Sequence, residues 1–263
     1  MCFFLVILHL NFYDYMIKKL KVLDTLVNFA SFNDFLKEIF SISEKLESSY
    51  ICLCNVHMLL EAKKDLEFCN ILNNANLTLP DGMPVAKALS WKYNILQDRV
   101  SGMDLLPLLI EECSKLKKSI YFYGSTDEAL DSIKKRIYSK YPSLEIKIYS
   151  PPFRLLSEKE EQERIKEINQ FNPDFVFVAL GCPKQEKWME KHKGKINSCM
   201  IGLGGAFPVY AGLQTRAPKW MCDNSLEWIY RLKLEPRRLF ARYFRTNIKF
   251  LYYICIDFLT NKN

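Results

Sequence analysis

The stretch FVFVALGCPKQEKW, from Phe175 to Trp188, opens as a strand and continues as a helix. Its first six residues are apolar without interruption and include β-branched valines, a pattern typical of strands that are buried on both faces in α/β proteins. Gly181 ends the strand, and Pro183 can open a helix that ends near Gly194. The stretch therefore predicts a strand of a parallel sheet followed by its crossover helix.

Three polar residues follow the end of this strand: Lys184, Gln185 and Glu186. In open α/β sheets, ligands bind where the strands reach their carboxyl ends. The order of the residues thus places these side chains where a substrate would bind. A strand-to-helix turn with solvated charges fits this segment equally well.

The same alternation of strand and helix extends over most of the chain. Strands are predicted at 22–27, 50–54, 77–79, 119–123, 144–149, 175–180 and 199–203. Helices are predicted at 33–46, with Asn33 as the cap, 56–69, 105–115, 127–138 and 157–171. The last of these begins with a capping box made by Ser157 and Glu160. This pattern predicts an α/β fold, Rossmann-like, with a largely parallel sheet and helices on both faces.

The character of the chain changes near Arg216, where basic and aromatic residues begin to interleave. We expect a body of residues 16–215 and a helical, membrane-associating appendage of residues 216–263. A basic segment attracts the phosphates of nucleic acids, membrane headgroups or nucleotide substrates. A solvated basic face on an amphipathic helix is the alternative.

Residues 1–15, MCFFLVILHLNFYDY, have an apolar core that is shorter than the roughly 20 residues needed to span a bilayer. They lack a basic region and a cleavage site, which argues against a secretory signal. We interpret them as an interfacial anchor or as an upstream start, with Met16 beginning the body, and we favour the second interpretation.

Composition restricts the class of protein further. The chain has 263 residues, 49% of them hydrophobic, which is enough for a full core, and a formal net charge of +7. Its nine cysteines include no C-x-x-C pair, and its three histidines lack the spacing of metal ligands. This pattern favours a reducing compartment and predicts neither a zinc site nor a disulfide framework.

Two short motifs could carry chemistry. Pro80-Asp81-Gly82 follows a predicted strand, and a carboxylate held there by a tight turn can act as a general base. Gly124-Ser125-Thr126 leads into a helix, where backbone N–H groups can bind phosphate. Pro-Asp-Gly is also a common turn sequence. The Gly124-Ser125-Thr126 motif is neither a G-x-G-x-x-G nor a Walker sequence, so it is a weak signal for phosphate binding.

A series of longer blocks resembles the WecG/TagA/CpsF family, glycosyltransferase family 26. In chain order the blocks are NVHMLLEA, LPDGMPVA, DRVSGMDL, FYGS, ALGCPKQEKW, GLGGAF, TRAPKW and LEWIYRLKLEPRR. They extend from about Val22 to Tyr243. The blocks GCPKQEKW and LEWIYRL-x-x-EPRR are the most specific of them.

The resemblance implies an inverting hexosyltransferase that works without a metal ion or another cofactor. It would move a hexose or N-acetylhexosamine, with an N-acetylmannosamine-type donor favoured, from a UDP-sugar to a polyprenyl-diphosphate-linked sugar. The implied place is the cytoplasmic face of the plasma membrane, as a peripheral protein on an anionic surface. The implied pathway is cell-surface polysaccharide or teichoic acid synthesis. No nucleic-acid partner is implied, and the oligomeric state, including a homo-oligomer, stays open.

The resemblance also implies roles for individual residues. Asp81 matches the proposed general base. Arg99 and Gln185 match substrate-binding positions of the family, and Arg231, Arg237 and Arg238 match the arginines proposed to hold the diphosphate. The other predicted substrate-binding residues lie in the same blocks or at the predicted strand ends described above: Asn55, Gly124, Ser125, Lys184 and Glu186. The chain departs from the family at Leu53, where many members have Thr, and at Pro208, where many have Asp. These departures make the substrate preference less certain than the reaction.

Two other functions are compatible with parts of the sequence. A nucleotide-dependent oxidoreductase would share the α/β pattern, although no dinucleotide fingerprint follows any predicted strand. A nucleic-acid-binding protein could use the basic aromatic tail, and its binding would depend steeply on salt. The chain also has no Asp-x-Asp pair to hold a divalent ion, so arginines would have to stabilise a diphosphate leaving group.

Overall fold

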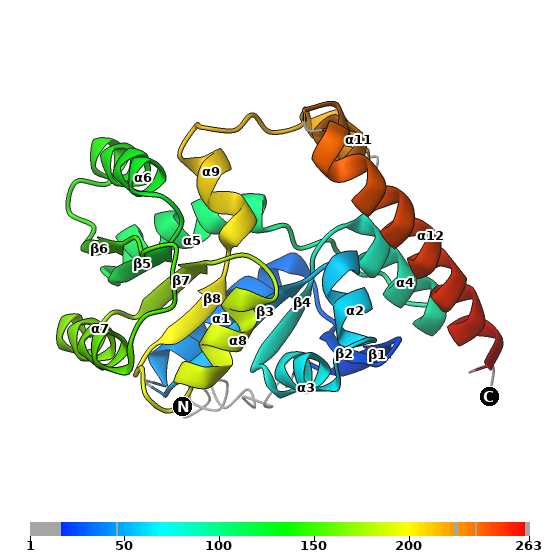
Figure 1. Cartoon of the computed structure of the whole chain (residues 1–263), viewed down its shortest axis with the longest axis horizontal. Helices are drawn as coiled ribbons and strands as arrows, with labels where there is room; N and C mark the ends of the chain where they lie inside the picture. Colours follow the sequence, from blue (N-terminus) through cyan, green and yellow to red (C-terminus); the bar gives the residue numbers. More distant parts are fainter. Residues whose placement is uncertain (1–16, 46, 224–225, 235, 261–263) are drawn as a thin grey trace, which may run out of the picture.

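The computed structural model describes residues 17–45, 47–223, 226–234 and 236–260, so the predicted extension at residues 1–15 lies outside it. The described chain forms a six-stranded parallel sheet in the order β4-β3-β8-β7-β5-β6 (Figure 1). Its strands are β3 (Ser49–Cys54), β4 (Leu77–Pro80), β5 (Ile120–Gly124), β6 (Ile146–Tyr149), β7 (Phe175–Ala179) and β8 (Cys199–Gly202). The predicted Rossmann-like fold is confirmed.

Helices cover both faces of the sheet because its strands carry apolar side chains on both sides. Phe175 and Phe177 of β7 pack into one hydrophobic cluster, and Val176 and Val178 pack into the other. The first cluster includes side chains of α1 (Phe32–Glu44), α5 (Gly102–Leu116), α6 (Asp127–Lys140) and α9 (Phe207–Tyr210). The second includes α2 (Val56–Ala62), α3 (Leu66–Asn74), α4 (Met83–Tyr93), α7 (Glu158–Phe171) and α8 (Lys184–His192).

The predicted first strand at 22–27 is wrong. The chain instead forms an antiparallel hairpin of β1 (Lys19–Val22) and β2 (Thr25–Asn28). Leu23 adopts a φ of 55°, which turns the chain where the apolar pattern suggested continuity. The hairpin is fastened to β4 because the Asn28 carboxamide oxygen accepts a 2.6 Å hydrogen bond from the Thr78 N–H.

The helical predictions need three corrections. The expected helix at 56–69 is two helices, α2 and α3, because Asp65 caps α3 with its carboxylate and ends the run. Ser31, not Asn33, is the N-cap of α1. Helix α4 was not predicted, although Pro84 in its first turn is a recognisable start signal. The capping box of Ser157 and Glu160 on α7 is confirmed.

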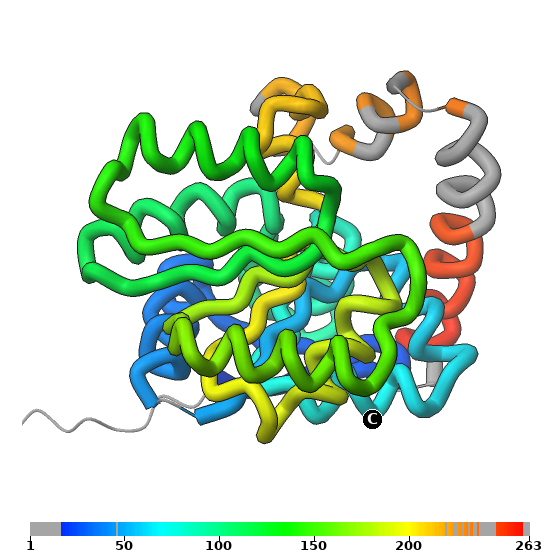
Figure 2. The backbone as a smooth tube through the Cα atoms, turned by 60° about the vertical axis from the view of Figure 1, so that its left-hand side comes forward, coloured from blue at the N-terminus to red at the C-terminus, as the bar shows by residue number. Residues whose placement is uncertain are grey.

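The C-terminal segment is helical, as predicted, and comprises α10 (Lys219–Asp223), α11 (Glu227–Leu234) and α12 (Pro236–Thr260). Figures 1 and 2 show α12 on the side of the molecule away from β6, alongside α2. Phe250 and Ile254 are buried in the cluster that includes α2, and Lys92 of α4 pairs with Asp257 at 2.5 Å. None of the described helices is both long enough and apolar enough to cross a bilayer.

We expect Gly124→Ala to unfold at a lower urea concentration, with a loss of about 2–4 kcal/mol in the free energy of unfolding. Gly124 has a φ of 105°, and a Cβ there would lie 2.4 Å from the Ala179 carbonyl oxygen on β7. Gly194→Ala is the matched control, because its φ of 80° is similar but nothing lies within 4 Å. The control should lose only the conformational part, about 1–2 kcal/mol. Equal losses in the two variants would contradict the steric explanation.

Candidate functional site

The predicted base and two other predicted residues meet at the carboxyl ends of β3 and β4. The Asp81 N–H donates a 2.9 Å hydrogen bond to the Cys54 carbonyl oxygen, which extends the pairing of β4 with β3 beyond Pro80. The Val100 N–H donates a 3.0 Å bond to the Pro80 carbonyl oxygen. Asn55 follows Cys54, and Arg99 precedes Val100. The backbone therefore gathers the blocks NVHMLLEA, LPDGMPVA and DRVSGMDL at one edge of the sheet.

Asp81 is partly exposed at this edge. Gly82, with a φ of 87°, redirects the chain so that α4 begins at the next residue. The turn is therefore fixed by the strand before it and the helix after it. A carboxylate at such a turn is held in place and still reachable by a ligand, which is what a general base requires.

Asn55 is the N-cap of α2, and its carboxamide oxygen accepts a 3.2 Å hydrogen bond from the Met58 N–H. This bond fixes the side chain at the start of α2, one residue after Cys54, whose carbonyl oxygen accepts from the Asp81 N–H. Leu53, which replaces the threonine of many family members, is 5% exposed and belongs to the hydrophobic cluster under α5. At Leu53 the chain thus has an apolar side chain buried in the core and no hydroxyl at the edge.

Gly124 and Ser125 lie further along the same edge, at the end of β5. The Ser125 N–H donates to the Ala179 carbonyl oxygen at 2.8 Å. This N–H is therefore used in hydrogen bonding to the end of β7. The Thr126 side chain caps α6 by accepting from the Ala129 N–H at 3.3 Å. The expected phosphate-binding turn therefore uses part of its hydrogen-bonding capacity internally.

The three polar residues after β7 separate into an exposed one and two buried ones. Lys184 is exposed, whereas Gln185 is 7% exposed and Glu186 is 0% exposed. The Gln185 Nε2 donates to the Glu186 Oε1 at 2.7 Å. Gln185 packs under the turn after β8, since a Cβ on Gly204 would lie 2.6 Å from its Oε1. Sequence order placed all three at the sheet edge, but in this structure Glu186 has no surface that a substrate could touch.

Burial determines the protonation of Glu186. Removal from water raises its pKa to about 7, against a smaller lowering by hydrogen bonds from Gln185, its own backbone N–H and the Cys182 thiol. Its Oε2 and the Oε1 of Gln185 have no hydrogen-bond partner. Buried polar atoms without partners are unusual in native proteins and favour the neutral acid here.

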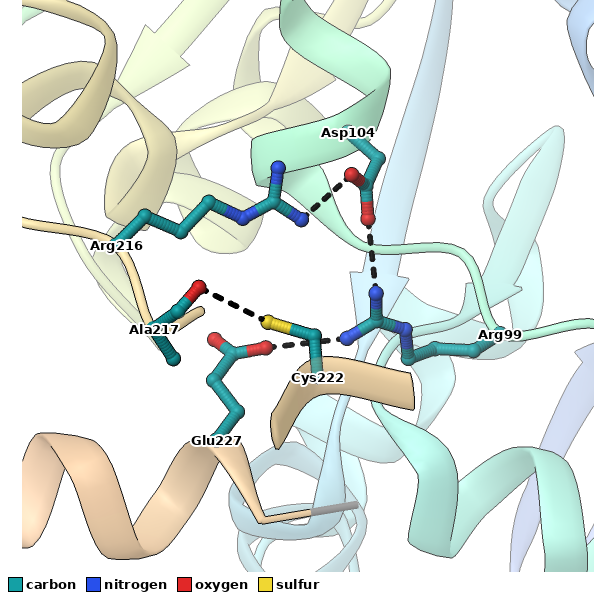
Figure 3. A network of polar contacts seen from close by, with 6 residues as sticks. All are labelled: Arg99, Asp104, Arg216, Ala217, Cys222 and Glu227. Carbon is teal, nitrogen blue, oxygen red and sulfur yellow. Dashed lines mark hydrogen bonds and ion pairs between the residues drawn. The ribbon is translucent and has the colours of Figure 1, made fainter. Parts of the chain in front are cut away.

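Arg99 lies in a network of four charged side chains (Figure 3). Its guanidinium donates to Asp104 at 2.9 Å and to Glu227 of α11 at 3.1 Å. Asp104 also accepts from Arg216 at 2.5 Å. The sequence indicated Arg99 but not its partners. They occur in the DRVSGMDL, TRAPKW and LEWIYRL blocks, and only the tertiary structure joins those blocks.

The remaining predicted residues belong to the appendage. Arg231 lies in α11, and Arg237 and Arg238 lie in α12. Their side chains fall outside what the structure describes. Within the described residues, no group of three or more His, Cys, Asp or Glu side chains is arranged to hold a metal ion.

The buried Glu186 makes stability depend on pH. Between about pH 4.5 and pH 7 this carboxyl is ionised in the unfolded chain and protonated in the folded protein, so the unfolded state binds fewer protons and stability falls as pH rises. Glu186→Gln cannot ionise. As the pH rises through this window, we expect the free energy of unfolding of Glu186→Gln to increase relative to that of the wild type, by up to roughly 3 kcal/mol. Urea unfolding at a series of pH values measures the difference.

The control for this experiment is Glu190→Gln, an exposed glutamate on the same helix. Its stability curve should run parallel to that of the wild type. A parallel curve for Glu186→Gln as well would mean that Glu186 is ionised in the folded protein.

The chain is similar to known proteins over most of its length. Over 215 residues the chain is 36% identical to N-acetylglucosaminyldiphosphoundecaprenol N-acetyl-beta-D-mannosaminyltransferase of Bacillus subtilis (strain 168), covering 80% of each chain. It is 32% identical to the protein of the same name from Bacillus spizizenii, over 73% of this chain and 74% of that one. It is 27% identical to the protein of the same name from Staphylococcus aureus (strain NCTC 8325 / PS 47), over 76% of this chain and 78% of that one. The model of the glycosyl transferase WecG/TagA/CpsF family matches residues 20–263, and the chain belongs to this family.

Proposed function

We propose that this protein is an inverting glycosyltransferase that moves N-acetylmannosamine from its UDP derivative to N-acetylglucosaminyl-diphosphoundecaprenol. The reaction would serve cell-surface polysaccharide or teichoic acid synthesis on the cytoplasmic face of the membrane. The names of the relatives support both the sugar and the acceptor. The observation that carries the proposal is the position of Asp81, beside Asn55 and Arg99, at the carboxyl edge of the sheet.

Asp81 fits the role of general base. A sugar hydroxyl is a poor nucleophile until a base removes its proton as the new bond forms. Asp81 would take this proton while the acceptor oxygen attacks the anomeric carbon from the side opposite the leaving UDP. Attack from that side inverts the anomeric centre. One carboxylate suffices for this reaction, since no covalent intermediate has to form.

The leaving diphosphate requires positive charge that is fixed in place before the bond breaks. The chain has no Asp-x-Asp pair, and we propose that Arg231, Arg237 and Arg238 supply this charge. Arginine suits the task because its planar guanidinium binds phosphate oxygens through paired hydrogen bonds and stays charged. No metal or other cofactor is part of the proposal.

A UDP-release assay tests the function. The purified protein is given UDP-N-acetylmannosamine, UDP-N-acetylglucosamine or UDP-glucose, with a short-chain N-acetylglucosaminyl-diphosphate lipid, in buffer containing EDTA. We expect release to require both the lipid and the N-acetylmannosamine donor. Release from another donor would leave the reaction class intact and change the sugar. Release from none of the donors would contradict the proposal.

We expect Asp81→Asn to lower kcat by about 10²–10⁴-fold while the Kd for UDP stays within about twofold. The amide preserves the shape of the side chain but cannot accept the proton. Isothermal titration with UDP and the transfer assay give the two quantities. Asp131→Asn, on the exposed face of α6, is the control and should transfer at the wild-type rate. Normal transfer by Asp81→Asn would remove Asp81 from the role of base.

The appendage supports the proposed membrane association. One face of α12 packs on α2 through Phe250 and Ile254. A second face leaves apolar side chains in solvent, namely Ile248, Leu251, Tyr252 and Leu259. Their spacing of three, four and seven residues puts them on one side of the helix. An apolar stripe on a basic segment is the pattern of a helix that lies in the interface of an anionic membrane.

We expect the double variant Leu251→Ser/Leu259→Ser to bind phosphatidylglycerol liposomes about tenfold or more weakly than the wild type, because two apolar side chains no longer leave water. Liposome flotation measures the bound fraction. Leu66→Ser is the control, since Leu66 is 75% exposed but belongs to α3 and not to the outer face of α12. Equal binding by all three proteins would show that this face of α12 does not contact the membrane.

A further inference from the structure

The four charged side chains at the appendage form a continuous chain of opposite charges. Arg216 pairs with Asp104, Asp104 pairs with Arg99, and Arg99 pairs with Glu227 (Figure 3). The four residues come from the segment after α9, the first turn of α5, the loop after α4 and the first turn of α11. The network therefore connects parts of the chain that are more than 100 residues apart in sequence.

The pair of Arg99 and Glu227, at one end of this network, is shielded from water. The side chain of Arg99 is 13% exposed, and that of Glu227 is 19% exposed. A surface pair such as Lys37 and Asp34, at 79% and 45%, contributes little because solvent screens it. A shielded, hydrogen-bonded pair holds its partners more firmly, since either charge left alone would be poorly solvated.

The pair joins the appendage to the candidate site. On one side, the Val100 N–H bonds to the Pro80 carbonyl oxygen, so Arg99 is held next to Asp81. On the other side, Glu227 is the first residue of α11. The Tyr230 hydroxyl donates to the Thr215 hydroxyl at 3.1 Å, which ties the same helix to the segment that precedes it. The start of α11 is thereby fixed relative to the predicted base.

The guanidinium of Arg99 already makes hydrogen bonds within the protein. Its two terminal nitrogens each donate to a carboxylate of the protein, Asp104 and Glu227. The network has two guanidinium groups and two carboxylates, so its net charge is zero. It therefore offers a diphosphate little attraction of its own. The positive charge for that group has to come from residues that the network positions.

We propose that Glu227 is a positioning residue, and that Arg99 acts chiefly through it by holding α11 at a fixed place beside Asp81. This inference rests on the proposed function only in taking Asp81 as the reacting centre. Arg231 follows Glu227 by four residues, so its Cα lies about 6 Å further along the same helix. Fixing Glu227 thus sets the distance between Asp81 and the basic residues of α11. The family resemblance implies that Arg99 contacts the substrate directly. In this proposal that contact is secondary to the role of Arg99 in holding α11.

A double-mutant cycle tests this division of roles. Glu227→Gln, Arg99→Met and the double variant are assayed for kcat/KM in sugar transfer. If Arg99 acts through Glu227, each single variant should lose about tenfold or more, and the double variant should be no worse than Arg99→Met alone. If Arg99 binds substrate independently, the two losses should multiply, and this result would overturn the proposal.

A second measurement does not require activity. Hydrogen–deuterium exchange of the backbone amides at 226–234 should speed up about tenfold or more in Glu227→Gln and in Arg99→Met, because α11 loses its tie to the body. Glu111→Gln removes a carboxylate from an exposed pair with Lys115 on α5 and should leave both exchange and transfer unchanged. Glu227→Asp keeps the charge and should recover part of the protection.

The two measurements separate this inference from the proposed function. Faster exchange in variants of a protein that transfers no sugar would support the role of the Arg99–Glu227 pair in positioning α11 and would contradict the proposed sugar transfer. Unchanged exchange at 226–234 in both variants would contradict the positioning role of the Arg99–Glu227 pair, whatever the transfer rate. Thermal unfolding of each variant shows whether Arg99→Met is folded, and Arg99→Gln, which also removes the charge, replaces it in the cycle if it is not.

Discussion

The hydrogen bond from the Asp81 N–H to the Cys54 carbonyl oxygen is the contact on which the candidate site depends. It continues the parallel pairing of β4 with β3 by one residue after Pro80, and Gly82 then turns the chain away into α4. Because parallel strands end at the same edge of a sheet, this bond also sets Asp81 beside Asn55. A carboxylate in a flexible turn would have to be ordered in every catalytic cycle. Here the sheet orders it beforehand.

Two polar side chains are buried at the carboxyl edge of the sheet, after β7. The amide of Gln185 and the carboxyl of Glu186 are buried against each other under the turn that follows β8. Keeping a carboxyl there is costly, and its pKa rises accordingly. Glycine at 202 and 204 makes room for the Gln185 side chain, since a Cβ at either position would lie within 3 Å of it. The GCPKQEKW and GLGGAF blocks are therefore parts of one packed unit.

The appendage and the body are more closely joined than a change in composition suggests. Phe250 and Ile254 of α12 are buried in the same cluster as α2, and Lys92 pairs with Asp257 at the far end of that helix. Arg99 pairs with Glu227, the first residue of α11. The predicted boundary between residues 215 and 216 remains a prediction, and these contacts cross it. Under the proposed function, these ties would hold α11 and α12 at a fixed place relative to Asp81, the proposed base, while the outer face of α12 contacts the membrane.

The sequence by itself determined the class of fold, because apolar runs such as FVFVAL alternate with helical segments along most of the chain, the pattern of a parallel sheet covered on both faces. It also determined the blocks that identify the family, with Asp81 among them. It did not show the β1–β2 hairpin, because Leu23 in a left-handed turn has no signal in an apolar pattern. It placed Lys184, Gln185 and Glu186 together, whereas helix α8 exposes the first and buries the other two. Above all, it could not pair Arg99 with Glu227. Ion pairs between residues so distant in sequence are decided by where the tertiary structure places α11 relative to the loop after α4, and the local sequence does not specify that placement.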